Sequence, residues 1–153
     1  LELVDVSDPD APRAVGGASF AGGDSEAVTD HLAVTWFAPA SAVALPLRTC
    51  ADGAVGFDGL VVYDVSPDGG FAERGRVDHV GAEPGGFCEA EPPRVRRSVF
   101  VDDAVLSVGV DRVAIVGLDD FSAPRAVIEL WDGGDDGPEP ATPDLPEPAP
   151  EDP

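Results

Sequence analysis

Residues 60–66 read Leu-Val-Val-Tyr-Asp-Val-Ser, an apolar stretch that ends in an Asp, a Val and a Ser. Residues 1–7, Leu-Glu-Leu-Val-Asp-Val-Ser, match it 59 positions earlier, and residues 113–118, Val-Ala-Ile-Val-Gly-Leu, match it 53 positions later. The pentapeptide Ala-Pro-Arg-Ala-Val also occurs twice, at 11–15 and 123–127, and its offset of 112 equals the sum of those two offsets. We infer that three copies of one supersecondary unit lie in register along the chain.

The rest of the sequence up to residue 131 consists of short apolar runs separated by Asp, Gly and Pro, which is the pattern of β-strands. No segment keeps the 3.6-residue apolar period of a helix for three turns, and only a short helical turn near 24–28 is expected. The expected strands fall into two sets of four: 32–37, 42–47, 60–65 and 71–80, then 98–101, 104–110, 112–118 and 125–130.

A four-stranded unit that recurs every 40 to 60 residues is typical of a β-propeller blade. The predicted fold is therefore all-β, a β-propeller with about two and a half four-stranded blades, namely a half blade over 1–18 and blades over 19–80 and 81–131. In this register, residues 48–59 connect two strands of one blade, and residues 81–96 connect that blade to the next. Trp36 is expected in the core, on an inner strand.

Two features suggest that the chain is the C-terminal part of something longer. Met is absent, so residue 1 is not expected to be a translation start. Propellers close with four to eight blades, so further blades of the same chain are expected upstream. At the other end, residues 132–153 are rich in Pro and acids and contain no base, which predicts a disordered acidic tail.

The charge of the chain excludes some classes of partner. Thirty acidic residues face nine basic ones, all of them Arg, and the formal net charge is -21. Binding to nucleic acid requires a basic surface, and so does docking on an anionic membrane. Neither is expected. Adaptation to high salt and a GC-rich genome that replaces Lys with Arg both remain open as explanations for this composition.

The two cysteines, Cys50 and Cys88, fall in connections that emerge on the same face of a propeller. A disulfide between them would close a loop of about forty residues and contribute roughly 3–4 kcal/mol. Such a bond would indicate an oxidising, extracellular compartment. The alternative is two unpaired thiols in a cytosolic protein. Zinc is not expected, because neither Cys belongs to a Cys-x-x-Cys pair.

The two histidines each follow an acid, as Asp30-His31 and Asp78-His79. An Asp-His pair can orient an imidazole as a base or a metal ligand, but it also ties strands to loops in a purely structural role. We interpret both pairs as structural and assign no catalytic residue, since no Gly-x-Ser-x-Gly elbow occurs.

Three arginines, Arg94, Arg96 and Arg97, form a dense basic patch. Such a patch could bind an anion, but in so acidic a chain we favour ion pairs between blades. The acidic clusters at 5–10 and 64–68 follow strands and suit turns, and they lack the spacing of a calcium loop. No metal or cofactor is expected, with calcium kept as an alternative.

A family resemblance agrees with these inferences. Residues 60–79, Leu-Val-Val-Tyr-Asp-Val-Ser-Pro-Asp-Gly-Gly-Phe-Ala-Glu-Arg-Gly-Arg-Val-Asp-His, and residues 96–101, Arg-Arg-Ser-Val-Phe-Val, resemble the secreted C-terminal β-propeller domain family of bacteria and archaea. That family is distantly related to WD40 repeats. Residues 3–12 and 25–31 fit the same pattern, whereas the acidic tail does not belong to it. The resemblance implies a secreted or surface-attached propeller and no established catalytic residues.

From the sequence we therefore expect a non-enzymatic binding scaffold outside the cell or in its envelope. Its ligand would be a protein or a surface polymer. Two alternatives remain at this stage. One is a propeller hydrolase or lyase whose site lies in the central channel, where Thr35 and Ser98 are the polar residues of the inner strands. The other is a calcium-stabilised adhesion module.

Overall fold

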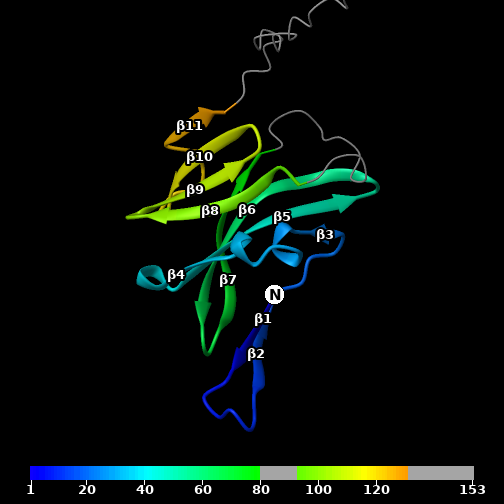
Figure 1. Cartoon of the computed structure of the whole chain (residues 1–153), viewed down its shortest axis with the longest axis vertical. Coiled ribbons are helices and arrows are strands. Elements are labelled where there is room, and N and C mark those ends of the chain that lie inside the picture. Colours follow the sequence, from blue (N-terminus) through cyan, green and yellow to red (C-terminus); the bar gives the residue numbers. More distant parts are fainter. Residues whose placement is uncertain (80–92, 131–153) are drawn as a thin grey trace, which may run out of the picture.

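The computed structural model describes residues 1–79 and 93–130, which form antiparallel strands, turns and three 3₁₀ helices (Figure 1). The prediction of an all-β fold is confirmed. The helices are η1 (Glu26–Val28), η2 (His31–Ala33) and η3 (Ala38–Ala40). The predicted acidic tail at 132–153 lies outside the described residues.

The described strands group into three sheets. The first consists of β1 (Glu2–Asp5) and β2 (Arg13–Gly17). The second consists of β3 (Gly23–Asp24), β4 (Thr35–Phe37), β5 (Ala42–Ala51), β6 (Ala54–Ser66) and β7 (Gly70–Asp78). The third consists of β8 (Val95–Val101), β9 (Ala104–Gly109), β10 (Arg112–Gly117) and β11 (Ala126–Glu129).

The sequence repeats fall on equivalent strands of the three sheets. The apolar repeat at 1–7, 60–66 and 113–118 covers β1, β6 and β10, and each of these strands pairs with the next strand of the chain. The Ala-Pro-Arg-Ala-Val repeat leads into β2 and β11, which are the partners of β1 and β10. The repeat register is therefore the strand register of the fold.

The sheet of β8–β11, here called the last blade, is a four-stranded meander. The sheet of β4–β7, here called the middle blade, has the same order, and β3 pairs beside β4 on the same edge of β5. The β1–β2 hairpin supplies the two outer strands of a preceding blade and projects at the lower end of Figure 1. Two and a half blades are thus present in the described residues, as predicted.

The prediction that residues 48–59 form a connection is wrong. β5 and β6 continue through this region and are joined by a two-residue turn, Asp52-Gly53, in which both φ angles are positive. An Asp-Gly pair of this kind makes the tight hairpin turn whose twist matches that of the flanking strands. The Gly and Asp residues that suggested a loop instead lie inside a long hairpin. The expected helical turn near 24–28 is present as η1, whereas β4 begins at Thr35, three residues later than predicted.

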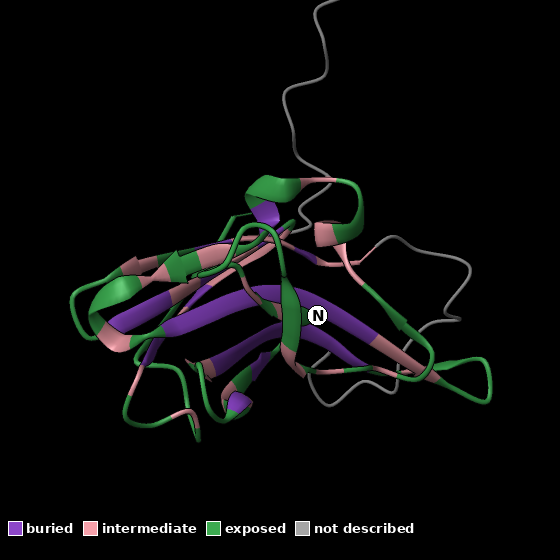
Figure 2. Cartoon of the chain, turned by 90° about the horizontal axis from the view of Figure 1, so that it is seen from below, coloured by how far each residue is buried: buried purple, intermediate pink, exposed green. Residues whose placement is uncertain are grey.

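The middle and last blades pack face to face. One apolar cluster joins them, and the buried residues concentrate on the long central strands (Figure 2). At the inner strands, the rings of Phe37 and Phe100 stack with centroids 4.8 Å apart. The cluster consists of Ala42, Ala44, Leu60, Val62 and Val77 from the middle blade and Val95, Val105, Ala114 and Val116 from the last blade.

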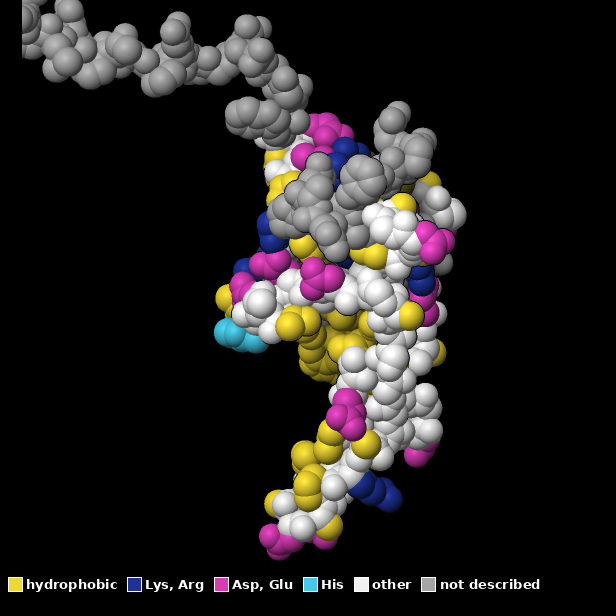
Figure 3. All heavy atoms as spheres, turned by 90° about the vertical axis from the view of Figure 1, so that its right-hand side faces the viewer, with side chains coloured by type: hydrophobic (Ala, Val, Ile, Leu, Met, Phe, Trp, Pro, Cys, Tyr) yellow, Lys and Arg dark blue, Asp and Glu magenta, His cyan; other side chains and the backbone are white. Residues whose placement is uncertain are grey.

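Trp36 departs from its predicted place in the core, because its side chain is 54% exposed. It pairs with Val43 and so shares the face of the middle blade that points away from the last blade. On that side Phe20 packs against the apolar cluster of the middle blade, and Trp36 lines a cavity of about 520 Å³ beside the β1–β2 hairpin. Figure 3 shows hydrophobic side chains that line a hollow above this projecting hairpin.

Candidate functional site

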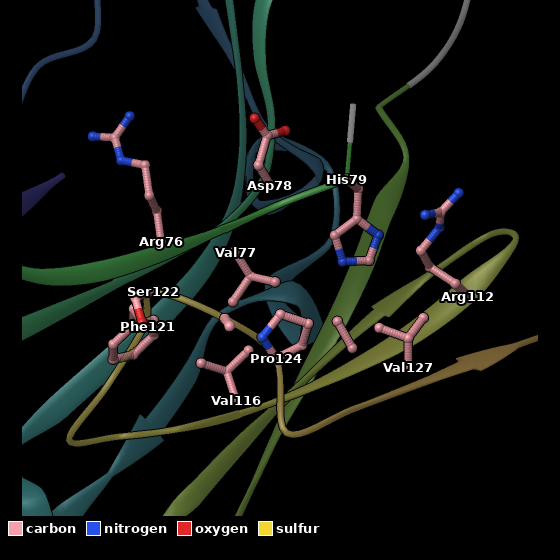
Figure 4. Close-up of a pocket in the computed structure, with 12 residues that line it drawn as sticks. Arg76, Val77, Asp78, His79, Arg112, Val116, Phe121, Ser122, Pro124 and Val127 are labelled. Carbon is pink, nitrogen blue, oxygen red and sulfur yellow. The ribbon is translucent and has the colours of Figure 1, made fainter. Parts of the chain in front are cut away.

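His79 lies directly after β7, where the middle blade meets the last one (Figure 4). Its backbone N–H donates to the carbonyl of Asp58 at 2.9 Å, which extends the pairing of β7 with β6 by one residue. Because side chains alternate along a strand, Val77 and His79 point inward while Asp78 points to solvent. Only 2% of His79 is exposed.

The His79 imidazole bonds across the blade interface. Its Nε2 is hydrogen-bonded to Ser107 Oγ of β9 at 2.9 Å, and Ser107 is fully buried. Its Nδ1 is also buried and has no hydrogen-bond partner. Burial lowers the pKa of His79 below its ordinary value, and the Arg112 cation lowers that pKa further. The ring is therefore held neutral and ties the two blades together.

A small polar corner surrounds the unpartnered Nδ1. A Cβ on Gly109 would lie 2.9 Å from Nδ1 and 3.1 Å from the Arg112 carbonyl oxygen, so only glycine leaves room for the ring. Two further buried atoms without a hydrogen-bond partner belong to the adjoining turn, Asp111 Oδ1 and Arg112 Nε. Buried polar atoms are nearly always satisfied. Three such atoms on neighbouring groups therefore mark an unusual place in this fold.

The corner adjoins a cavity of about 340 Å³ between β7, β10 and the segment that leads into β11. Apolar side chains make up much of its wall. Polar or charged side chains also line it, namely Arg76, Asp78, His79, Arg112 and Ser122 (Figure 4). Part of the wall is the second Ala-Pro-Arg-Ala-Val repeat at 123–127. The apolar lining consists of Val77, Ala114, Val116, Phe121, Ala123, Pro124 and Val127.

Asp30-His31 does not form the Asp-His pair that the sequence suggested. The carboxylate of Asp30 caps η2 by accepting from the Leu32 N–H at 2.9 Å, and it also accepts from Arg97. The His31 side chain is exposed. Asp78 is exposed as well, and the hydrogen-bond partner of the His79 ring is Ser107. Asp30 is thus engaged by the N-terminus of η2 and by Arg97, and the His79 ring is engaged by Ser107.

The arginine patch is divided among separate acids. Arg96 pairs with Glu26 of η1 at 2.5 Å, and Arg97 pairs with Asp30. Both join β8 of the last blade to the segment before β4. Arg94 lies 3.4 Å from Asp111 across its own blade. All nine arginines of the chain are described, and each has a carboxylate no farther than 3.4 Å away.

A buried ion pair lies beside this patch and was not expected from the sequence. Asp58 is 1% exposed, and its carboxylate lies 3.3 Å from Arg48 Nε and accepts from the Arg94 backbone N–H at 3.0 Å. Burial raises the pKa of Asp58, although the bond from Arg94 and the charge of Arg48 oppose that shift. The signal available in the sequence was a lone Asp within the apolar run Phe57–Val62.

The two polar residues of the inner strands bond to each other. Ser98 Oγ donates to Thr35 Oγ1 at 3.0 Å, and Thr35 Oγ1 in turn donates to the Ser98 carbonyl at 3.0 Å. These bonds join β4 of the middle blade to β8 of the last blade. Both hydroxyls are used in the contact between blades.

The predicted disulfide cannot be placed in full, because Cys88 lies outside the described residues. Cys50 lies near the end of β5, and its N–H donates to the Gly22 carbonyl at 3.1 Å. The Cys50–Cys88 pairing stays a prediction.

The two acidic clusters are occupied by turn contacts and ion pairs. Asp5 accepts from the Ser7 N–H and pairs with Arg13, and the bond from Ser7 is the main reason that the pKa of Asp5 falls to about 2. Asp8 accepts from the Asp10 N–H, and Asp64 pairs with Arg74. Within the described residues no group of three or more His, Cys, Asp or Glu side chains could hold a metal ion.

Comparison with known proteins gives one match. A family model described as a beta propeller domain matches residues 1–121. No curated protein and no solved structure matches the chain. In the described part of the chain, no helix has the length and apolar character needed to cross a membrane.

Proposed function

The chain belongs to the beta propeller domain family, and from this premise we propose that it is a non-enzymatic binding scaffold outside the cell or in its envelope. The observation that carries the proposal is the use of hydroxyl side chains as ties between blades. Ser107 bonds His79, and Ser98 bonds Thr35, in each case across the interface of two blades. A hydroxyl that is engaged in this way holds two blades in a fixed position, which suits a rigid binding surface.

The charge distribution supports a neutral or cationic partner. Every arginine is paired with an acid, so the remaining carboxylates give the surface its negative sign. Nucleic acids and anionic membranes would be repelled by such a surface. A protein or an uncharged surface polymer remains a suitable ligand, and further blades of the same chain would complete the ring.

The rival function is a hydrolase. One observation favours it: the hydrogen bond between Ser107 and His79 resembles that between a nucleophilic serine and its general base. Two features argue against it. Ser107 is fully buried, so a substrate would have no access to its Oγ, and His79 Nδ1 lacks the carboxylate partner that orients the base in a catalytic triad.

A substrate screen separates the two functions. The full chain is assayed against ester, glycoside and polyuronide substrates, alongside Ser107→Ala and Ser98→Ala. We expect no turnover above the blank for any protein. Turnover that disappears in either variant would overturn the scaffold proposal in favour of an enzyme.

The extracellular location has its own test. Peptide mapping of the full chain under non-reducing conditions is expected to give a linked Cys50–Cys88 peptide, because an oxidising compartment would form that bond. Two free thiols in the protein isolated from its source would contradict the location.

A further inference from the structure

The middle and last blades meet at two edges that differ in chemistry. At the inner edge, Arg97 of β8 pairs with Asp30, which caps η2 just before β4. At the outer edge, the ring of His79, which follows β7, is hydrogen-bonded to Ser107 of β9 at 2.9 Å. The bond from the Leu32 N–H, together with Arg97, holds the pKa of Asp30 below its ordinary value, so the inner pair keeps its charges in mild acid. Histidine is the side chain that ordinarily changes charge in that range.

Among the described residues, the outer edge offers no acceptor for a second proton on the ring. Only 2% of His79 is exposed, and its Nδ1 is buried without a hydrogen-bond partner in this part of the chain. A Cβ on Gly109 would lie 2.9 Å from Nδ1 and 3.2 Å from Cε1, so the ring lies directly on the strand backbone. In the imidazolium both nitrogens are donors, and a buried donor without an acceptor costs free energy. The charged ring is therefore disfavoured while this contact is closed.

The charged groups around His79 oppose one another. Arg112 of β10 and Arg94, just before β8, disfavour a further positive charge. Asp111, between β9 and β10, and Asp78, at the end of β7, favour it. Burial has the largest influence and Arg112 the next, so the pKa of His79 lies below its ordinary value. Asp111 lies 3.1 Å from Arg112 and 3.4 Å from Arg94, and Asp78 is exposed. The two acids therefore compensate a proton on the buried ring only in part.

The ring lies beside open space at the rim of the contact. His79 lines the cavity of about 340 Å³ between β7, β10 and the segment before β11 (Figure 4). It does not belong to the apolar cluster that joins the two blades. The segment before β11 contacts the middle blade through Phe121, whose Cγ lies 2.3 Å from the position of a Cβ on Gly75. A turn of the His79 ring into this cavity thus leaves the apolar cluster packed.

We propose that the contact of His79 with Ser107 is a pH-sensitive latch: protonation of the ring in mild acid opens the outer edge between the blades, while the inner edge stays closed. The released ring takes up one proton from water, and both of its nitrogens then find acceptors in water. The inner edge acts as the hinge, held also by the stacked rings of Phe37 and Phe100. This inference goes beyond the scaffold function, because it holds whatever the propeller binds.

Amide hydrogen exchange, measured by NMR on the full chain at pH 7.5 and pH 5.5, tests the proposal. The His79 N–H, bonded to the Asp58 carbonyl at 2.9 Å, reports the outer edge. The Ala33 N–H, bonded to the Asp30 carbonyl at 3.1 Å in η2, reports the inner edge. After correction for the intrinsic effect of pH on exchange, we expect protection of His79 to fall severalfold and that of Ala33 to change by less than about twofold. One proton taken up only in the open state limits the fall to about tenfold, because the ordinary pKa of His is about 6.5.

A matched pair of histidine variants assigns the effect. His79→Gln keeps a side-chain amide that can bond Ser107 but does not titrate, so exchange at residue 79 should lose its dependence on pH. His31→Gln changes the exposed histidine of η2 and should leave that dependence as it is in the wild type.

Three results would overturn the inference. Unchanged protection of His79 at pH 5.5 would mean that the outer edge stays closed, and an equal loss at Ala33 would mean that the whole fold opens. A loss that persists in His79→Gln would assign the change to another group, such as the buried Asp58. The comparison of His79 with Ala33 is made in the wild type, so the test does not depend on the folding of a variant.

Discussion

The chain contains the dipeptide Asp-His twice, and the two copies have opposite surroundings. His31 belongs to the 3₁₀ helix η2 on the outside of the molecule, and Asp30 is engaged by the helix N-terminus and by Arg97. His79 directly follows β7, the edge strand of the middle blade, and is buried against Ser107 of the next blade. The two dipeptides have the same sequence, so the difference between them comes from the residues that surround each one in the fold, including those of the neighbouring blade.

Removal of the two imidazoles should give the largest difference. His79→Ala leaves a cavity and an unbonded Ser107 hydroxyl between the blades, so we expect a loss of about 3 kcal/mol in unfolding free energy. His31→Ala, on an exposed helix, should change it by less than about 0.5 kcal/mol. Urea unfolding of both variants measures this. Equal losses would contradict the contrast between the two sites.

The space beneath the His79 ring gives the next largest effect. A Cβ on Gly109 would lie 2.9 Å from His79 Nδ1, so Gly109→Ala should displace the ring and cost about 2 kcal/mol. Gly56→Ala is the matched control, because its nearest neighbour would lie at 3.7 Å. Thermal melts of both variants test this. A melting temperature for Gly109→Ala equal to that of Gly56→Ala would mean that the ring does not lie over Gly109.

The buried His79 ring also predicts that the stability of the wild type depends on pH more strongly than that of a variant without this imidazole. The folded-state pKa of His79 is lowered, so the unfolded chain binds a proton first as the pH falls, and stability is lost from about pH 6.5 downward. Arg112 and Arg94 favour the neutral ring, while Asp111 and Asp78 oppose them. Melting temperatures from pH 7.5 to 5 should fall more steeply for the wild type than for His79→Gln.

Parallel curves for the two proteins would contradict a lowered His79 pKa. The raised pKa of Asp58 acts in the opposite direction, because its cost of burial appears as the pH rises above 3.8. It is present in both proteins and cancels in their difference.

The smallest changes in melting temperature are expected for substitutions of Asp30, beside the exposed His31. Asp30→Asn keeps an oxygen that can cap η2 and loses only the charge opposite Arg97, whereas Asp30→Ala loses both contacts. We therefore expect Asp30→Ala to lower the melting temperature more than Asp30→Asn, and both less than Gly109→Ala. The reverse order of the two Asp30 variants would show that the ion pair outweighs the cap.

The repeats are the reason that so much of the fold could be predicted. Copies of one motif at 1–7, 60–66 and 113–118 fall on β1, β6 and β10, because each blade repeats the same strand pattern and the position within a repeat defines the position within a blade. The strand order followed from that register without knowledge of any contact.

The features that were missed depend on contacts between units. Asp58 was read as part of a loop, but its pairing with Arg48 and its bond from Arg94 allow a charged residue inside a buried strand. Trp36 was placed in the core, but the side of the blade that it faces is covered only in part. Ser107 and Gly109 carried no signal of their own, because their role exists only opposite His79.

An NMR titration of the imidazoles tests the central claim most directly, namely that His79 is a buried neutral tie between blades. The chain contains only two histidines, so ¹⁵N-detected spectra of the full chain hold two ring systems, and His79→Gln assigns one of them by its loss. We predict that the His79 ring titrates below its ordinary pKa, because burial disfavours the charged imidazolium. Titration at or above pH 6.5 would contradict the burial of His79 against Ser107.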